Sequence, residues 1–264
     1  MIYIILALLG LCLGSFVNAF VWRIKEEKDW VKARSQCTHC GHVLGAMDLV
    51  PVLSWIALKG SCRYCKKPIS IQYPLVELLT MMLFIASYAF WPDKIGNGAA
   101  GIVSFVIWLC MIVGLVAISV YDIRWSIIPD KVSYPLIGLA IVHVVLKATV
   151  FDAGPLAIRD AVIGLLVGAG LFYAVLELSK GRMIGGGDVK LGIVIGLLLG
   201  ARDSFIALYV ASLSGASFVG ILLLLKKATR KSRIPFGPFL VLGAIVGRLF
   251  GGALWNWYTT RFLQ

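Results

Sequence analysis

The chain has 264 residues, of which 60% are hydrophobic and only 14% charged, and its formal net charge at pH 7 is +12. Ordinary soluble domains are about 45–50% apolar and about 25% charged. This composition excludes a typical soluble protein and indicates that lipid is the main solvent. Because lipid cannot hydrogen-bond exposed backbone groups, the membrane spans are expected to be helices. The sequence therefore predicts an all-α polytopic membrane protein.

Apolar windows of roughly 20 residues, the length with which a helix crosses a bilayer, occur about eight times. They cover residues 1–22, 72–91, 99–121, 132–150, 155–178, 189–201, 204–225 and 235–258. The first window has no charged stretch before it and no small-residue cleavage site after it, so we interpret it as a retained span and not a signal peptide. The sixth window is short, and we expect it to be tilted, broken at its glycines or longer than drawn.

Lysine and arginine concentrate in alternate loops. Nineteen lie in or beside the loops after windows one, three, five and seven, and only Lys94, Arg159, Arg202 and Arg261 lie in or beside the opposite loops. The positive-inside rule places the basic loops in the cytoplasm and both termini outside. The positive charge is thus first a topology signal, with contact to anionic membrane lipid as a second effect. Nucleic acid is not expected as a partner.

A polar insert at residues 23–71 separates the first transmembrane helix, residues 1–22, from a membrane domain at residues 72–264. The insert contains two Cys-x-x-Cys pairs about 20 residues apart, formed by Cys37, Cys40, Cys62 and Cys65. This spacing is typical of a tetrahedral Cys₄ zinc site, and disulfides are disfavoured in a reducing cytoplasm. So small an insert lacks apolar surface of its own, so we expect one structural zinc to stabilise it. Iron or a redox dithiol pair are the alternatives.

Two aspartates stand at the ends of apolar windows. Asp188 ends the run Gly185-Gly186-Gly187-Asp188 and opens the window 189–201, whereas Asp122 follows the window 99–121. An acid at a membrane boundary is costly unless it has a function, and the glycines allow the backbone to bend and to approach another chain closely. Two carboxylates at one membrane face can share a proton and activate water. This pattern predicts a membrane-embedded aspartyl protease.

Each acid also has a structural interpretation. Asp122 could pair with Arg124 at the interface, and Asp188 could cap its helix beside Lys190. For Asp130 we favour the structural role, as the N-cap or first-turn residue of the window 132–150.

Other polar residues lie within the apolar windows. Glu77 is one turn into the window 72–91, where it is expected to orient a neighbour or contact substrate. Arg248 must snorkel, pair with an acid or face a wet cavity. Three isolated residues are expected to be buried packing residues: Cys12, Cys110 and His143.

The sequence resembles a known family, the bacterial type IV prepilin peptidases. The resemblance runs through nearly the whole length and depends on several motifs in one order. They are Gly14-Ser15-Phe16-Val17-Asn18 with Arg23, the paired cysteines, Pro51-Val52-Leu53-Ser54-Trp55, Ile69-Ser70-Ile71-Gln72-Tyr73-Pro74-Leu75-Val76-Glu77, the Asp122 to Asp130 segment, and Gly185-Gly186-Gly187-Asp188-Val189-Lys190-Leu191. One departure is Thr38, where family members often have proline.

The resemblance implies an inner-membrane endopeptidase with Asp122 and Asp188 as catalytic residues. Gly185, Gly186, Gly187, Lys190 and Glu77 are its candidate supporting residues. The implied substrates are prepilins or pseudopilins with a short basic leader that ends in glycine. Members with the cysteine insert typically also methylate the new N-terminus from S-adenosylmethionine, for which the sequence shows no recognisable binding motif. A peptidase without methyltransferase activity, a proton-coupled transporter and a zinc-stabilised membrane scaffold are the alternatives, and the oligomeric state is unknown.

Overall fold

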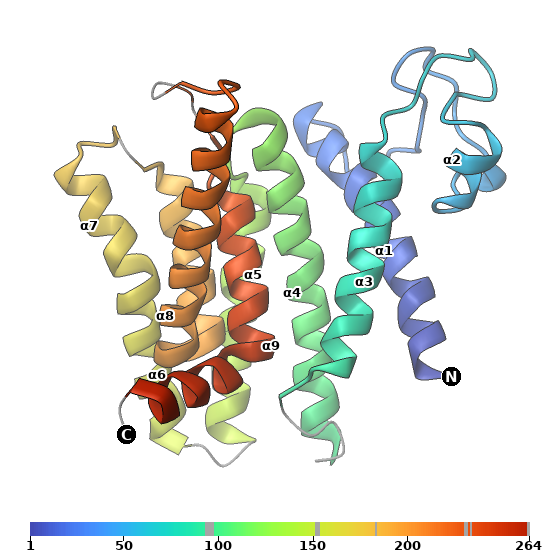
Figure 1. The fold of residues 1–264 in the computed structure, drawn as a ribbon. Helices are drawn as coiled ribbons and strands as arrows, with labels where there is room; N and C mark the ends of the chain where they lie inside the picture. The colour runs from blue at the N-terminus through green and yellow to red at the C-terminus, as the bar shows by residue number, and fades with distance from the viewer. Residues whose placement is uncertain (93–97, 151–153, 183, 230–231, 233, 263–264) are drawn as a thin grey trace. The chain divides into compact units, whose positions relative to one another are not determined.

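The computed structural model describes residues 1–92, 98–150, 154–182, 184–229, 232 and 234–262. Within these ranges the regular elements are helices joined by loops (Figure 1). Two isolated β-bridges lie in the loops, Gln36 with Val43 and Ser61 with Pro68. The elements are α1 (Ile2–Lys25), the 3₁₀-helix η1 (Ala46–Asp48), α2 (Leu53–Ala57), α3 (Gln72–Ala89), α4 (Gly98–Trp125), α5 (Asp130–Thr149), α6 (Gly154–Leu165), the π-helical η2 (Leu166–Gly170), α7 (Leu171–Leu178), α8 (Gly186–Leu224) and α9 (Gly237–Phe262). The predicted all-α membrane class is confirmed.

Six helical segments of the described chain are long and apolar enough to cross a membrane. They are Ile2–Lys25, Gly98–Trp125, Asp130–Thr149, Gly154–Leu178, Gly186–Leu224 and Gly237–Phe262. The predicted window 72–91 corresponds to the 18-residue α3, and the windows 189–201 and 204–225 are the two arms of α8. The eight predicted windows therefore correspond to eight apolar helical segments. Of the basic loop residues, Lys94, Arg230, Lys231 and Arg233 lie outside the described residues.

Met1–Ala89 and Ile112–Val120 form one compact unit. In it α1 packs closely on α3, because a Cβ atom at Gly14 would lie only 2.6 Å from the Cα of Glu77. The Asn18 side-chain amide also donates to the backbone oxygen of Tyr73 at 3.1 Å. The insert between the two helices belongs to the same unit, and the predicted division of the chain after residues 22 and 71 stays a prediction.

Phe90–Met111 and Tyr121–Gln264 form the second unit. Four glycines bring the backbones of α6, η2 and α8 into direct contact: Gly164 and Gly168 face Gly192 and Gly196, and a Cβ atom at Gly196 would lie 2.4 Å from the Gly164 oxygen. Small residues at such spacing allow membrane helices to pack backbone to backbone. This contact fixes the first arm of α8, the arm that begins beside Asp188.

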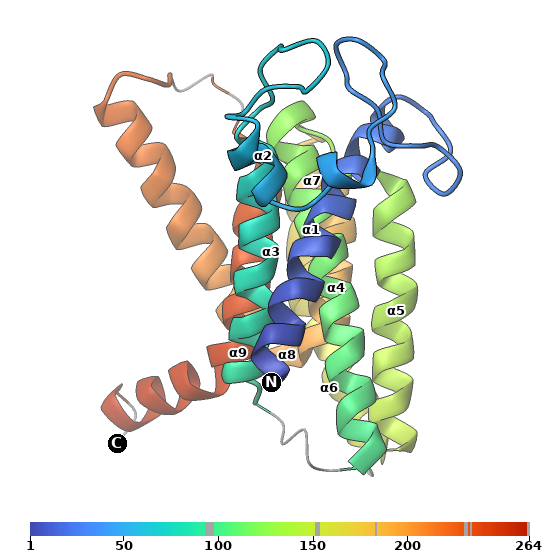
Figure 2. The ribbon, with the colours of Figure 1, turned by 90° about the vertical axis from the view of Figure 1, so that its right-hand side faces the viewer.

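The chain reverses at Gly200, whose φ of 77° and ψ of −174° are not helical. Ser204 Oγ donates to the Ile195 oxygen at 3.3 Å although the residues are nine apart, so the two arms of α8 fold back at this point. Asp160 of α6 caps the second arm by accepting a hydrogen bond from the Ala201 N–H at 3.0 Å. Figure 2 shows the second arm, in orange, running obliquely away from the kink. The reversal explains why the sixth predicted window is short.

The isolated residues within the spans have different outcomes. His143 is buried, as predicted. Cys12 and Cys110 are exposed, so their predicted burial is wrong. A thiol is small and apolar, so it can face lipid as well as the protein interior. The apolar character of a cysteine in a membrane helix therefore does not predict that it is buried. Arg248 is buried with its guanidinium over the ring of Trp91, 4.4 Å from the centroid. A cation–π contact thus accommodates this charge within the span.

Candidate active site and metal centre

Asp122 lies in the last turn of α4, and only 5% of it is exposed. The helix ends just after it, where the Ser126 N–H donates to the Asp122 backbone oxygen at 2.7 Å and Ser126 adopts a φ of 52°. The Asp122 carboxylate accepts a hydrogen bond on Oδ2 from the backbone N–H of Gly237 at 2.9 Å. The start of α9 therefore holds this carboxylate.

Asp188 is the third residue of α8, and it is half-buried. Its Oδ2 accepts a hydrogen bond from the N–H of Gly185, the residue that caps the helix, at 3.2 Å. A Cβ atom at Gly187 would lie 2.8 Å from the Cβ of Ile128. The glycine run therefore permits both the helix start at Gly185 and a close contact with the loop that follows Asp122.

The two predicted catalytic aspartates lie on segments that contact each other. Asp122 lies in the last turn of α4 and Asp188 in the first turn of α8. The loop that follows Asp122 contacts the residue before Asp188 through Ile128 and Gly187, which brings the two carboxylates within electrostatic range of each other. Each carboxylate has one oxygen bound by a backbone N–H, from Gly237 in one case and Gly185 in the other. Two partly buried carboxylates that approach each other can share a proton, which is the chemistry of an acid–base pair.

Asp130 and Lys190 link the two segments that carry these acids. Asp130 is the first residue of α5, in agreement with the predicted first-turn position, and its carboxylate forms an ion pair with the Lys190 ammonium at 2.5 Å. The same ammonium lies 5.1 Å from the ring centroid of Tyr134. Arg124 was the alternative partner for Asp122. Its guanidinium carbon lies over the ring of Trp125, 5.8 Å from the centroid.

Glu77 is buried in α3, and its Oε2 accepts a hydrogen bond from the backbone N–H of Val52 at 2.7 Å. Val52 has a φ of 60°, which a β-branched residue rarely adopts. The buried carboxylate thus compensates for a strained turn at the start of α2. This contact favours the interpretation of Glu77 as a residue that orients a neighbour, here the insert, over direct contact with substrate.

The four cysteines of the insert converge, with their sulfur atoms all within 4.8 Å of one another and those of Cys37 and Cys65 3.9 Å apart. Zn–S bonds of about 2.3 Å place the sulfurs of a tetrahedron about 3.8 Å apart. The two loops are alike: the Cys37 N–H donates to His42 O and the Cys62 N–H to Lys67 O, both at 2.9 Å. The donor set and its spacing therefore fit a tetrahedral metal ion.

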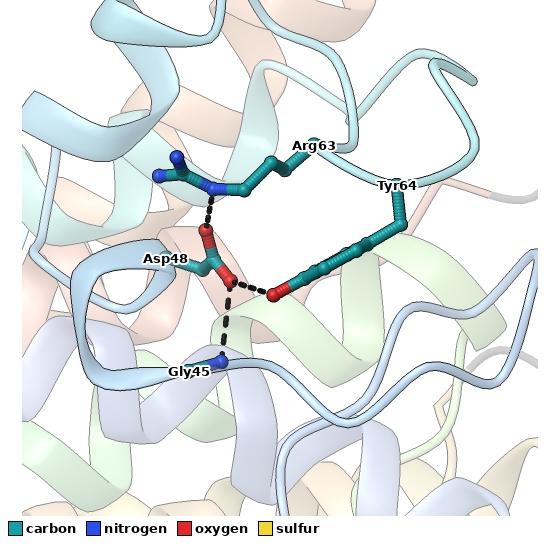
Figure 3. Close-up of polar contacts among 4 residues, drawn as sticks. All are labelled: Gly45, Asp48, Arg63 and Tyr64. Carbon is teal, nitrogen blue, oxygen red and sulfur yellow. Dashed lines mark hydrogen bonds and ion pairs between the residues drawn. The ribbon is translucent and has the colours of Figure 1, made fainter.

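Asp48 holds the second cysteine loop of this centre (Figure 3). It accepts hydrogen bonds from Arg63 Nε at 2.6 Å, the Tyr64 hydroxyl at 3.1 Å and the Gly45 N–H at 3.2 Å. The hydrogen bond from Arg63 is the main cause that lowers the pKa of Asp48 below its usual value. Arg63 and Tyr64 are the two residues between Cys62 and Cys65, so an ionised Asp48 fixes the second cysteine loop.

Comparison with known proteins adds independent information. Residues 8–91 match the family model of the bacterial peptidase A24 N-terminal domain, and residues 108–220 match that of the type IV leader peptidase family. A prepilin leader peptidase/N-methyltransferase of Aeromonas hydrophila is 33% identical, over 97% of this chain and 93% of the relative. The chain belongs to the type IV leader peptidase family.

Further relatives agree with this assignment. A prepilin leader peptidase/N-methyltransferase of Myxococcus xanthus (strain DK1622) is 36% identical, over 84% of this chain and 63% of the relative. A type 4 prepilin-like proteins leader peptide-processing enzyme of Escherichia coli O78:H11 is 31% identical, over 89% of each chain. No solved structure matches the chain. The resemblance to prepilin peptidases inferred from the motifs is confirmed, and the chain is a multi-pass membrane enzyme of this family.

Two residues at these centres were not singled out from the sequence. Gly237 contacts Asp122, and Asp48 holds the second cysteine loop through Arg63 and Tyr64. The available signal for Gly237 was its place in Pro235-Phe236-Gly237-Pro238, at the start of an apolar window. It lies beyond the region 108–220 that matches the leader peptidase family.

We expect the purified protein to contain one zinc ion per chain, measured by elemental analysis after exhaustive dialysis. Cys62→Ser should lose the metal because it removes one of four convergent thiolates, the one that is buried. Cys12→Ser is the matched control, since Cys12 is exposed and does not belong to the cluster. A wild-type protein without zinc, or full zinc content in Cys62→Ser, would contradict this prediction.

Proposed function

We propose that this chain is an aspartyl endopeptidase of the bacterial inner membrane that removes the leader from prepilins or pseudopilins. The observation that carries the catalytic assignment is the position of Asp122 and Asp188 at the ends of two apolar helices whose adjoining segments touch, through Ile128 and Gly187. Membership of the type IV leader peptidase family supports the reaction class. A proton-coupled transporter and an inert scaffold have no comparable support.

In the proposed reaction one carboxylate is ionised and the other protonated. The ionised group takes a proton from water as the water oxygen attacks the scissile carbonyl carbon, and the protonated group donates to the carbonyl oxygen. Collapse of the resulting diol breaks the C–N bond, and the departing amine takes up a proton from the pair. The backbone N–H donors from Gly237 and Gly185 support this chemistry because each fixes one oxygen of its acid.

The substrate and the position of the basic loops lead to the same proposed face of the membrane. The loops that follow α1, α4, α7 and α8 carry most of the lysine and arginine, and by the positive-inside rule this supports a cytoplasmic position for these loops and an outside position for both termini. A prepilin is itself inserted by an apolar helix, so its basic leader remains in the cytoplasm. The leader ends in glycine, and an extended peptide at this bond would meet Asp122 and Asp188 at the cytoplasmic face.

We further propose that the enzyme methylates the amine that cleavage releases, with S-adenosylmethionine as the methyl donor. The methyl group passes from the sulfonium sulfur to the amine nitrogen, which loses a proton. The name N-methyltransferase in the relatives supports this second activity. A zinc ion held by Cys37, Cys40, Cys62 and Cys65 would supply a structural cross-link to the insert.

Mass spectrometry of a prepilin co-expressed with this enzyme tests both activities. We expect the product to lack the leader up to its glycine and to carry one methyl group on the new N-terminal residue. An intact leader in the presence of folded, membrane-inserted enzyme would refute the proposed function. A cleaved but unmethylated product would show a peptidase without methyltransferase activity.

A further inference from the structure

We infer that Gly237 is a positioning residue of the aspartate pair, where its N–H and its lack of a side chain together set the place of the Asp122 carboxylate. This inference rests on the proposed catalytic role of Asp122. Gly237 is 115 residues from Asp122 in the sequence and is the first residue of the last helix, α9. No group of Gly237 titrates, so its contribution is geometric.

The hydrogen bonds at the start of α9 explain why this N–H is available. The first N–H groups of a helix have no acceptor within it. Phe239 and Leu240 donate to the Phe236 oxygen at 3.0 and 3.1 Å, and Pro238 has no N–H. The N–H of Gly237 instead donates to Asp122 at 2.9 Å, in a buried place. The positive end of the dipole of this 26-residue helix also attracts the carboxylate.

Position 237 requires glycine because there is no room for a Cβ atom, and not because of its backbone conformation. A Cβ atom on residue 237 would lie 2.6 Å from Asp122 Oδ2 and 3.3 Å from its Cγ. Gly237 is absent from the glycines with positive φ, so an alanine can adopt the same backbone. The atoms nearest to the new methyl group belong to the carboxylate, which is the end of a flexible side chain. Gly237→Ala should therefore displace the Asp122 carboxylate while leaving the helices in place.

Three glycine-to-alanine variants separate this role from a packing role. Gly237→Ala displaces the carboxylate. Gly243→Ala, on the same helix, would place a Cβ atom 2.1 Å from the backbone oxygen of Ala207, which cannot move without shifting α8. Gly138→Ala faces open space on α5 and serves as the neutral control. The three variants add the same methyl group, so only its surroundings differ.

Each variant is assayed for prepilin cleavage, for thermal stability and for methylation of a pilin supplied without its leader. For Gly237→Ala we expect kcat to fall on the order of a hundredfold, as for a catalytic group misplaced by about 1 Å. KM, the melting temperature and methylation should stay at wild-type values. Gly243→Ala should lower the melting temperature, the rate of cleavage and the rate of methylation. Gly138→Ala should leave all three at wild-type values.

The outcomes distinguish this inference from the proposed function. Wild-type cleavage with an unchanged kcat in Gly237→Ala would overturn the positioning role alone. Gly237→Ala could instead behave like Gly243→Ala and lose cleavage, melting temperature and methylation together. That result would also overturn the positioning role and would show that Gly237 only packs. Absence of cleavage by the wild-type enzyme would overturn the proposed function and this inference together.

Discussion

Asparagine in place of either Asp122 or Asp188 is expected to abolish prepilin cleavage and to leave expression and membrane insertion unchanged. An amide neither accepts the proton of water nor donates one as an acid, so the rate should fall by at least about a thousandfold. The asparagine oxygen can still accept the hydrogen bond from Gly237 or Gly185. Glutamate at either position should also remove cleavage, because one added methylene displaces the carboxylate.

Asp130→Asn is the matched control for this experiment. It removes the same charge from a neighbouring segment, but its ion pair with Lys190 is largely exposed, with 57% of the Asp130 side chain and 28% of the Lys190 side chain accessible. Exposed ion pairs contribute about 0–1 kcal/mol, so most activity should remain. A time course of leader removal by purified variants measures the difference. Wild-type rates in Asp122→Asn, or an Asp130→Asn variant as inactive as Asp188→Asn, would contradict the assignment.

Much of this architecture can be predicted from the sequence because membrane helices carry a strong local signal. The apolar windows, the acids at their ends and the cysteine pairs are all features of short segments. The reversal at Gly200 was harder to predict, because it depends on Asp160 of another helix capping the second arm of α8. The sequence alone showed only that the window before it was short.

Contacts between distant segments explain the residues that sequence analysis missed or misjudged. Gly237 and Asp48 acquire their roles from partners brought to them by the fold. Burial of Cys12 and Cys110 was wrongly predicted because a helix in lipid is apolar on its exposed face as well. Asp130 was correctly placed in the first turn of a helix, but its ion pair with Lys190 could not be inferred from either segment.

Cys62→Ser is expected to separate the two proposed activities, with methylation reduced to background and most leader cleavage retained. Cys62 is buried, and its loss removes a metal ligand from an insert that has little apolar core of its own. The loop held by Asp48 through Arg63 and Tyr64 should then lose its order. Cleavage should suffer less because the aspartate pair belongs to the other compact unit.

Two substrates and one converse variant test this separation. A pilin supplied without its leader reports methylation alone, and a full prepilin reports cleavage first. Asp188→Asn should leave a full prepilin both uncut and unmethylated, because methylation requires the freed amine, yet it should methylate the pre-cleaved pilin at the wild-type rate. Cys12→Ser, an exposed cysteine outside the cluster, should retain both activities. Equal loss of cleavage and methylation in Cys62→Ser would instead show that the zinc-bound insert is as necessary to the peptidase as the two aspartates are.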